Sequence, residues 1–276
     1  MFDPKTDKYP YPEDTAAHYI HLKENVGTVF DETYPYFDES KKMKRKQGLT
    51  RFLLRVFAFP LCRIRLGLRV KGRAVLKKYK DQLRQGVVSC SNHVHFWDFI
   101  ATMYALRPFK PYVLVWPENV RGENRNLIRS VRGVPVPDSG HRALHAMSEQ
   151  TKNKIKSGEW VHIYAEGSMW DYYCPIRPFK DGAAYYAAVT DRPLLPLAFS
   201  YRKPGFIRRV LFHQIALFNL CIGEPLFPNR SLAFEERKRD LVRRSHEAVC
   251  RLAGIDPAQN PYPPRYQQSR RVHYED

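Results

Sequence analysis

The sequence lacks several features that would define its class at once. No stretch reaches the roughly 18 uncharged apolar residues that a membrane-spanning helix needs. Its first eleven residues are polar and rich in proline, so we expect no secretory leader. The five cysteines are odd in number and show no paired spacing, which predicts reduced cysteines in a cytoplasmic protein. No phosphate-binding glycine loop of the P-loop or dinucleotide type is present.

Acidic residues are also scarce relative to basic ones. The 276 residues include 46 Lys and Arg but only 28 Asp and Glu, which gives a net charge of +18. Such a charge predicts an anionic partner, which can be nucleic acid, an anionic membrane surface or an acidic substrate. No nucleic-acid recognition motif accompanies the charge, so we expect no nucleic-acid partner. A hydrophobic fraction of 43% indicates a globular chain.

The chain divides by composition into four parts. Residues 1–48 read as a charged N-terminal arm, and residues 254–276 as an irregular tail. Residues 49–68 are apolar and aromatic but contain arginines, and Arg51 and Arg55 share one helical face. This pattern is typical of a helix that lies on a membrane surface, and equally of a helix that packs on a domain with solvated arginines. Pro60 should kink or end it.

Residues 69–253 alternate apolar runs of strand length with helical periods. This order predicts a single α/β domain with a mixed central sheet flanked by helices and preceded by the amphipathic segment. We expect Asp138 or Ser139 to cap one helix and Ser231 to cap the last. The expected strands are 68–72, 87–90, 111–116, 160–165, 193–199 and one or two within 210–222; the expected helices are 73–85, 99–106, 127–131, 138–157, 182–189 and 231–253.

The chemistry of the chain centres on His93 and Asp98, which lie between an expected strand and an expected helix. Residues five apart do not share a helical face, so the two side chains meet only if His93 lies in the turn and Asp98 in the first helical turn. A carboxylate that binds one ring nitrogen fixes the tautomer and leaves the other nitrogen free to take a proton. This arrangement predicts a general base that can activate a hydroxyl group.

Further along the chain, three more blocks join this pair, and together the four resemble the glycerolipid acyltransferase family of lysophosphatidic-acid-acyltransferase-like enzymes. The resemblance covers about residues 69–228. The blocks are the N-H-x4-D motif from Asn92 to Asp98, Arg132–Val136, the E-G-S block Tyr164–Ser168 and the proline-centred Leu195–Leu197, with further likeness at 179–183 and 222–225. Four blocks in the family's order are much more specific than any one alone.

The resemblance implies roles for individual residues. His93 would be the general base and Asp98 its orienting partner. Glu166, Gly167 and Ser168 would bind the acceptor or shape the site. The remaining candidates are Gly133, whose backbone can approach the developing oxyanion; His95 and Phe96, by adjacency; and Arg142, as a cation for the acceptor.

Two departures from the family concern the acceptor. Many members carry an arginine after the E-G-T block and another at the end of the second block, and here Met169 and Ser139 stand there. Arg142, Arg177 or Lys180 can replace those positive charges. The resemblance therefore implies acyl transfer more firmly than a phosphate on the acceptor.

The expected activity is transfer of a fatty acyl group from acyl-CoA or acyl-carrier protein to a lysophospholipid-like acceptor. We expect no cofactor or metal, and a position on the inner face of the cell membrane. A non-catalytic lipid-binding protein on the same fold is the main alternative. A metal site at His93 and His95 lacks the acid and histidine spacing of metallo-β-lactamase-like hydrolases. Cys90 lies within a strand and reads as a core residue rather than a nucleophile.

Overall fold

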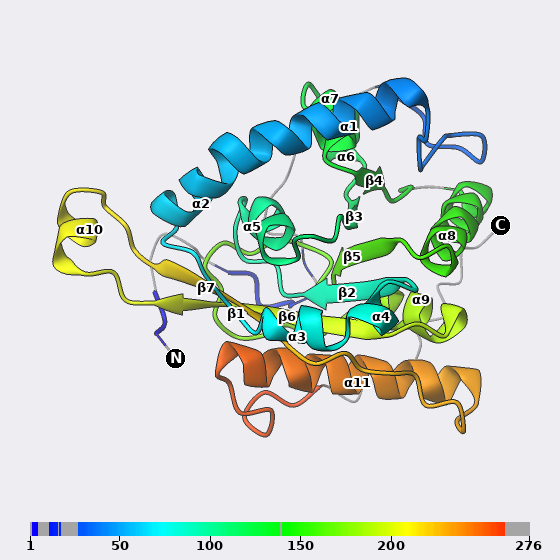
Figure 1. Ribbon diagram of the computed structural model, residues 1–276. Coiled ribbons are helices and arrows are strands. Elements are labelled where there is room, and N and C mark those ends of the chain that lie inside the picture. The colour runs from blue at the N-terminus through cyan, green and yellow to red at the C-terminus, as the bar shows by residue number, and fades with distance from the viewer. Residues whose placement is uncertain (1, 5–10, 16, 18–26, 139, 263–276) are drawn as a thin grey trace.

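The computed structural model describes residues 2–4, 11–15, 17, 27–138 and 140–262. These residues form a seven-stranded sheet of order β1-β7-β6-β2-β5-β3-β4 (Figure 1). Neighbouring strands are parallel except β6 and β7, which are antiparallel. The α/β class with a mixed sheet is therefore confirmed. The strands are β1 (Arg69–Lys71), β2 (Val87–Ser91), β3 (Tyr112–Val115), β4 (Gly133–Pro135), β5 (Trp160–Tyr164), β6 (Leu194–Arg202) and β7 (Leu217–Ile222).

Helices cover both faces of this sheet. One apolar core lies between the sheet and α8, α9 and α11, and a second lies between the opposite face and α2, α3, α4 and α5. Figure 1 shows α11 and α5 on opposite sides of the strands. The helices are α1 (Lys41–Leu53), α2 (Phe59–Arg65), α3 (Ala74–Lys78), α4 (Lys80–Leu83), α5 (Asp98–Ala105), α6 (Glu118–Arg121), α7 (Arg125–Ser130), α8 (His141–Lys156), α9 (Gly182–Thr190), α10 (Phe206–Val210) and α11 (Phe234–Ala253).

Strand β2 lies at the centre of the sheet, and all five of its residues are buried. After Cys90, the backbone of β2 no longer pairs with that of β6. The Asn92 side chain replaces the backbone hydrogen bonds that are missing there. Its amide nitrogen donates to the Phe199 carbonyl at 3.1 Å, and its oxygen accepts from the Phe199 N–H at 2.8 Å. The asparagine therefore fixes the position from which the following turn, with His93, leaves the sheet.

The amphipathic segment is one continuous helical arm that begins earlier than expected. Its basic first turns, Lys41–Lys46, belong to α1, and a π-helical stretch, Leu54–Ala58, joins α1 to α2. Of the two outcomes expected of Pro60, a kink or an end, the structure excludes the end, because the helix continues to Arg65. The π-helical hydrogen-bond shift just before Pro60 accommodates its missing N–H.

The expected N-terminal caps of two helices were wrong, because the side chains expected to cap them bind other groups. Asp138 does not cap α8; it pairs with Arg121, and Gly140 occupies the cap position. Ser139 lies outside the described residues. Ser231 bonds with Asn229, while Ala233 precedes α11.

Two expected elements have different extents. The expected helix 73–85 is divided between α3 and α4, and within 210–222 the strand is confined to β7. Among the described residues, no helix is both long and apolar enough to cross a membrane.

Candidate active site

The turn between β2 and α5 brings His93 and Asp98 together. His93 lies in the turn, Asp98 is the first residue of α5, and His93 Nδ1 is 3.1 Å from Asp98 Oδ2. The same carboxylate oxygen accepts hydrogen bonds from the backbone N–H groups of Val94 at 2.6 Å and His95 at 2.9 Å. The Asp98 carboxylate thus binds three groups of the preceding turn. The turn curves around this side chain, which brings His93 into contact with a residue five positions later.

The position of Asp98 suits a side chain that accepts hydrogen bonds. The side chain is buried, it receives backbone hydrogen bonds, and it stands at the start of a helix, where negative charge is favoured. Because Oδ2 accepts from Nδ1–H, the imidazole is held in the tautomer whose Nε2 is free to accept a proton.

The imidazole of His93 is supported on its face by Tyr164 from the end of β5. The two rings are stacked, with centroids 3.9 Å apart and planes within 13°. The His93 side chain remains 22% exposed, so a substrate hydroxyl can reach it. Within the described part of the chain, no hydrogen bond to Nε2 is present. The ring is therefore fixed by one nitrogen and one face, and the other nitrogen is available.

Glu166, directly after β5, forms a buried ion pair with Arg177. Its Oε2 lies 2.9 Å from Arg177 Nη2, and its Oε1 accepts from the Arg177 backbone N–H at 2.8 Å. Oε2 also accepts from the backbone N–H of His93 at 3.0 Å. Both side chains are 1% exposed. With its oxygens occupied in this way, Glu166 positions the backbone of His93 and is not exposed to an acceptor.

Arg177 was weighed from the sequence only as a replacement phosphate ligand, and its role in the site was missed. Its guanidinium donates to the hydroxyl of Ser168 at 2.8 Å and to the Ser168 carbonyl, and lies over the Trp170 ring at 4.4 Å. Arg177 thus fastens the E-G-S turn, and with a side chain only 1% exposed it is not presented to solvent. Arg177 lies eleven residues after Glu166, and no helix or strand period in the sequence between them predicts that the two side chains meet.

Gly167 occupies the exposed point of the same turn. Its φ of +78° lies in the left-handed region, and a Cβ there would be 2.6 Å from Lys180 Cε. The glycine therefore allows the Lys180 side chain to cross the turn. Burial lowers the pKa of Lys180, and the neighbouring Arg177 lowers it further. Of the cations considered for the acceptor, Arg177 and Lys180 both lie at the E-G-S turn, and Lys180 is the more exposed of the two.

His95 and Phe96, which follow His93, point to different surroundings. The His95 ring packs edge-on against Tyr172 and Phe218, and its Nδ1 accepts from the Trp97 N–H at 3.1 Å. Burial lowers the pKa of His95, so neutral imidazole is favoured. Phe96 is 77% exposed. His95 is thus part of the wall beside the turn, whereas Phe96 projects into solvent.

Gly133 and Arg142 are not brought to His93. Gly133 begins β4, three strands from β2, and the register places it level with Ser89, about 14 Å away across the sheet. A Cβ at Gly133 would lie 2.4 Å from the Ile128 side chain, so close packing of α7 explains the glycine. Arg142 is exposed at the start of α8, and no described contact joins it to the site.

Neutral, buried groups lie beneath the active-site histidine. His162 on β5 is fully buried between Ser89 and Ser91, and burial lowers its pKa to about 3. Burial also raises the pKa of the Cys90 thiol to about 12, which agrees with a core residue. No group of three or more potential ligands within the described ranges is arranged to hold a metal ion.

One comparison with known proteins, a match to a protein-family model, agrees with the sequence blocks. Residues 67–200 match the model of the acyltransferase family, and this segment contains both the His93 turn and the Glu166 turn. A search of curated proteins gives no match. Among solved structures, the chain is similar to the 1-acyl-sn-glycerophosphate (LPA) acyltransferase PlsC from Thermotoga maritima. The identity is 16% over 79% of this chain and 84% of that chain, with a TM-score of 0.48.

Proposed function

Residues 67–200 are an acyltransferase-family domain, and from this premise we propose that the enzyme acylates a lysophospholipid-like acceptor. The donor is acyl-CoA or acyl-carrier protein, and the acceptor contributes a hydroxyl group. One observation carries the proposal: His93 is held by the buried Asp98 carboxylate with its second ring nitrogen available.

In the proposed reaction, His93 Nε2 takes the proton of the acceptor hydroxyl as its oxygen attacks the thioester carbonyl carbon. The tetrahedral intermediate then collapses, the carbon–sulfur bond breaks, and the departing thiolate receives the proton from His93. Asp98 stabilises the imidazolium that exists between the two steps. Glu166 and Arg177 act as positioning residues, because they hold the His93 backbone.

The test is acyl transfer from labelled acyl-CoA and acyl-carrier protein to a panel of lysolipids, read by mass spectrometry. We expect one donor and acceptor class to give product, and His93→Ala to abolish it. His145→Ala, on an exposed surface, serves as the matched control. Absence of transfer by wild-type protein, with intact vesicle binding, would instead favour the non-catalytic lipid-surface protein.

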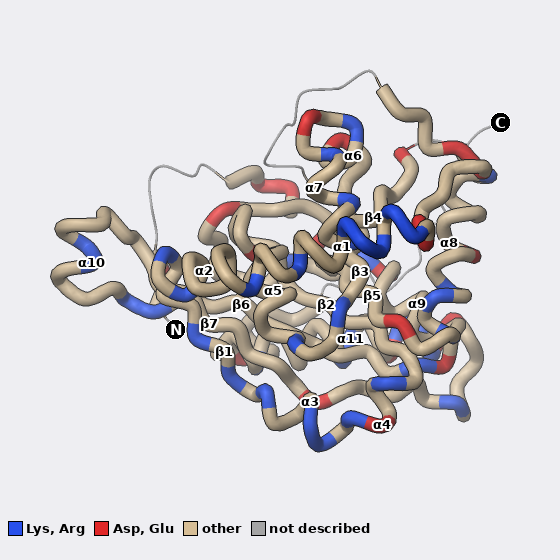
Figure 2. Tube along the Cα trace, turned by 45° about the horizontal axis from the view of Figure 1, so that its top comes forward, with Lys and Arg blue, Asp and Glu red and all other residues tan. Residues whose placement is uncertain are grey.

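The membrane-surface location of the enzyme is a second part of the proposal. The helical arm 41–65 directs apolar side chains outward, whereas a helix packed on a domain normally buries them. A second apolar element, α10, adjoins it: Arg208 donates to the Ile64 carbonyl at 2.9 Å. Lys and Arg lie on both elements (Figure 2). The most exposed apolar residues on the arm and in or just after α10 are Leu49, Phe52, Phe57, Ile64, Phe206, Ile207, Leu211 and Phe212.

These features support peripheral binding to anionic lipid on the inner face of the cell membrane. Vesicle sedimentation tests it. Phe52→Ser with Phe57→Ser should weaken binding to phosphatidylglycerol vesicles about tenfold or more. Each substitution removes a ring whose burial in the lipid contributes about 1.5–3 kcal/mol to the binding free energy. Phe227→Ser with Phe234→Ser is the matched control at a different surface. Binding that is absent at every salt concentration would overturn the proposed location.

A further inference from the structure

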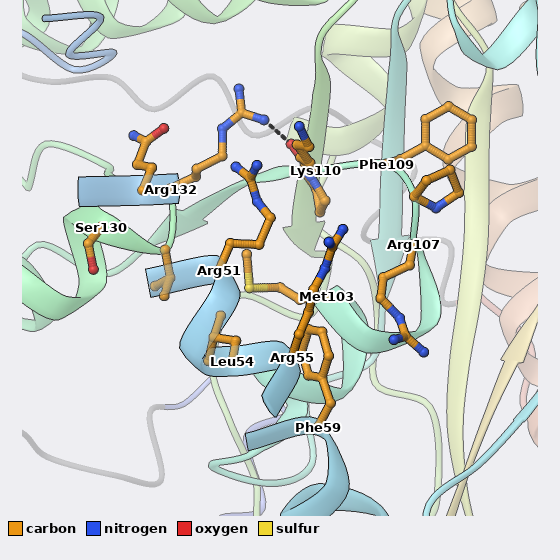
Figure 3. Close-up of a pocket in the computed structure, with 14 residues that line it drawn as sticks. Arg51, Leu54, Arg55, Phe59, Met103, Arg107, Phe109, Lys110, Ser130 and Arg132 are labelled. Atoms are coloured by element: carbon orange, nitrogen blue, oxygen red, sulfur yellow. Dashed lines mark hydrogen bonds between the residues drawn. The ribbon is translucent and has the colours of Figure 1, made fainter. Parts of the chain in front are cut away.

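The side of the helical arm that faces the domain carries arginines. Arg51 and Arg55, on one face of the arm, turn toward the domain rather than toward solvent alone, and they line a cleft between the arm and α5 (Figure 3). We call this the basic cleft. Its cationic residues are Arg51, Arg55, Arg107, Lys110 and Arg132, and its apolar residues include Leu54, Phe59 and Met103.

The basic cleft lies at the opposite edge of the sheet from His93. Lys110 comes just before β3, Arg132 just before β4 and Glu159 just before β5. Val87 at the start of β2 pairs with Trp160 at the start of β5, and His93 follows six residues after Val87. At about 3.3 Å per residue, the cleft is about 20 Å from His93 along the strands. The two are therefore separate sites.

Positive charge in the basic cleft is poorly compensated. Among the residues that the structure describes, the side chains of Arg51, Arg55 and Lys110 form no ion pair. Arg51 lowers the pKa of Lys110, with burial as the next cause. Glu159 compensates only Arg132, and Glu39 pairs with Lys154, so neither acid forms an ion pair with Arg51, Arg55 or Lys110. Like charges held together without counter-ions cost free energy unless an anion joins them.

Arg132 gives an independent indication of a ligand. It is 7% exposed, and its φ of +69° lies in the left-handed region, which is strained for a residue with a side chain. Its guanidinium stacks 3.5 Å from the Tyr112 ring centroid and donates to the Lys110 carbonyl and to Glu159 at 2.8 Å. Its Nε is buried without a hydrogen-bond partner in the described chain. A guanidinium held rigidly at the cleft presents its donors in a fixed fork, which suits recognition of a phosphate group.

We propose that the basic cleft is a second binding site, which takes a phosphate-bearing anion. Arginine guanidinium groups with a neighbouring ammonium group match phosphate oxygens in charge and geometry. The cleft itself has a volume of only about 30 Å³, but the hollow that adjoins it and shares Arg51, Lys110 and Arg132 has about 540 Å³, within the range of small-molecule sites. The phosphate can belong to the nucleotide part of coenzyme A or to the headgroup of an anionic lipid beneath the arm.

Two titrations of the full chain distinguish these sources. The first measures adenosine 3′,5′-bisphosphate by calorimetry, with inorganic phosphate as competitor; the second measures phosphatidylglycerol against phosphatidylcholine vesicles. Arg51→Gln with Lys110→Gln should weaken binding of one probe tenfold or more. Lys77→Gln with Lys80→Gln removes the same charge from an exposed surface and should leave that affinity within about twofold.

Selective loss for the nucleotide identifies the donor as the source of phosphate, and selective loss for the vesicles identifies the lipid. The thermal midpoint of the cleft variant should not fall, because the change relieves repulsion between cations. Unchanged affinity for both probes, an equal loss in the control variant, or no binding by the wild-type protein would overturn the proposal. Neither titration involves turnover, so the outcome is independent of the proposed acyl transfer.

Discussion

The two edges of the central sheet treat charge in opposite ways. At the edge where β2 and β5 end, the buried acids Asp98 and Glu166 are joined to His93 and Arg177. At the edge where β3 and β4 begin, Arg51, Arg55 and Lys110 form no ion pair with any described residue, and the helical arm that carries Arg51 also exposes apolar rings such as Phe57. The acids at the first edge are paired within the chain, whereas the cations at the second edge are those that we propose bind an anion.

We assign catalysis to the first edge and binding of a partner to the second. Paired buried charges hold a reacting group in one orientation before substrate arrives, which is what catalysis requires. Unpaired cations and exposed apolar rings gain free energy only when a partner binds. Substitutions at the first edge should therefore affect turnover and stability, and those at the second edge should affect binding alone.

The largest expected effect follows from Asp98→Asn. The amide can still accept hydrogen bonds from the turn, but it lacks the charge that stabilises the His93 imidazolium, so kcat should fall about 10²–10⁴-fold. Initial rates at saturating acceptor measure this. Asp81→Asn, at an exposed position in α4, should leave the rate unchanged. A similar rate for wild type and Asp98→Asn would remove Asp98 from the mechanism.

Breaking the Glu166–Arg177 pair should produce the largest loss of stability. Arg177→Met leaves a buried carboxylate uncompensated and should lower the free energy of unfolding by about 3–5 kcal/mol. Glu166→Gln with Arg177→Met should cost less than the sum of the single changes. Urea unfolding measures both effects, with Arg243→Met, in an exposed helical ion pair, as the control near 0.5 kcal/mol. Additive losses would show that the pair is not coupled.

His162 should give a smaller, pH-dependent effect. Its pKa of about 3 in the folded protein lies below its ordinary value of 6.5, so between these values only the unfolded chain binds the proton. Stability should therefore fall as pH decreases below 6.5, by about 2 kcal/mol at pH 5. His162→Gln should remove this part of the pH dependence of urea unfolding. An identical pH slope in the variant would show that His162 is protonated in the folded state.

The smallest expected effect on stability is at the outward face of the arm. Phe57 is 65% exposed, so Phe57→Ser should change the free energy of unfolding by less than about 0.5 kcal/mol. Its effect should appear in vesicle binding instead. A loss of several kcal/mol in urea unfolding would mean that the ring packs on the protein, and the contrast between the two edges would fail there.

The sequence predicted features that depend on local pattern. Buried strands such as β2 were visible as apolar runs, and the N-H-x4-D spacing was enough to place His93 beside Asp98. Features that depend on the approach of distant segments were not predictable. The pairing of Arg177 with Glu166 arises from a turn without periodicity. Gly133 reflects the close packing of Ile128, and the family block alone suggested a catalytic role that its position does not favour.

Helix periodicity also left the arm unresolved, because it locates two faces without showing which one meets the domain. In the structure Arg51 and Arg55 line the basic cleft, with Arg51 partly buried, while Phe52 and Phe57 are exposed, which is the reverse of a packed amphipathic helix.

The most direct test of this division uses one assay on three proteins. Acyl transfer to a water-soluble, short-chain lysophospholipid is measured for wild type, His93→Ala, and Phe52→Ser with Phe57→Ser. We predict that His93→Ala loses transfer, while the surface variant keeps the wild-type rate because no membrane is needed. Transfer by His93→Ala at the wild-type rate, or an equal loss in both variants, would contradict the account.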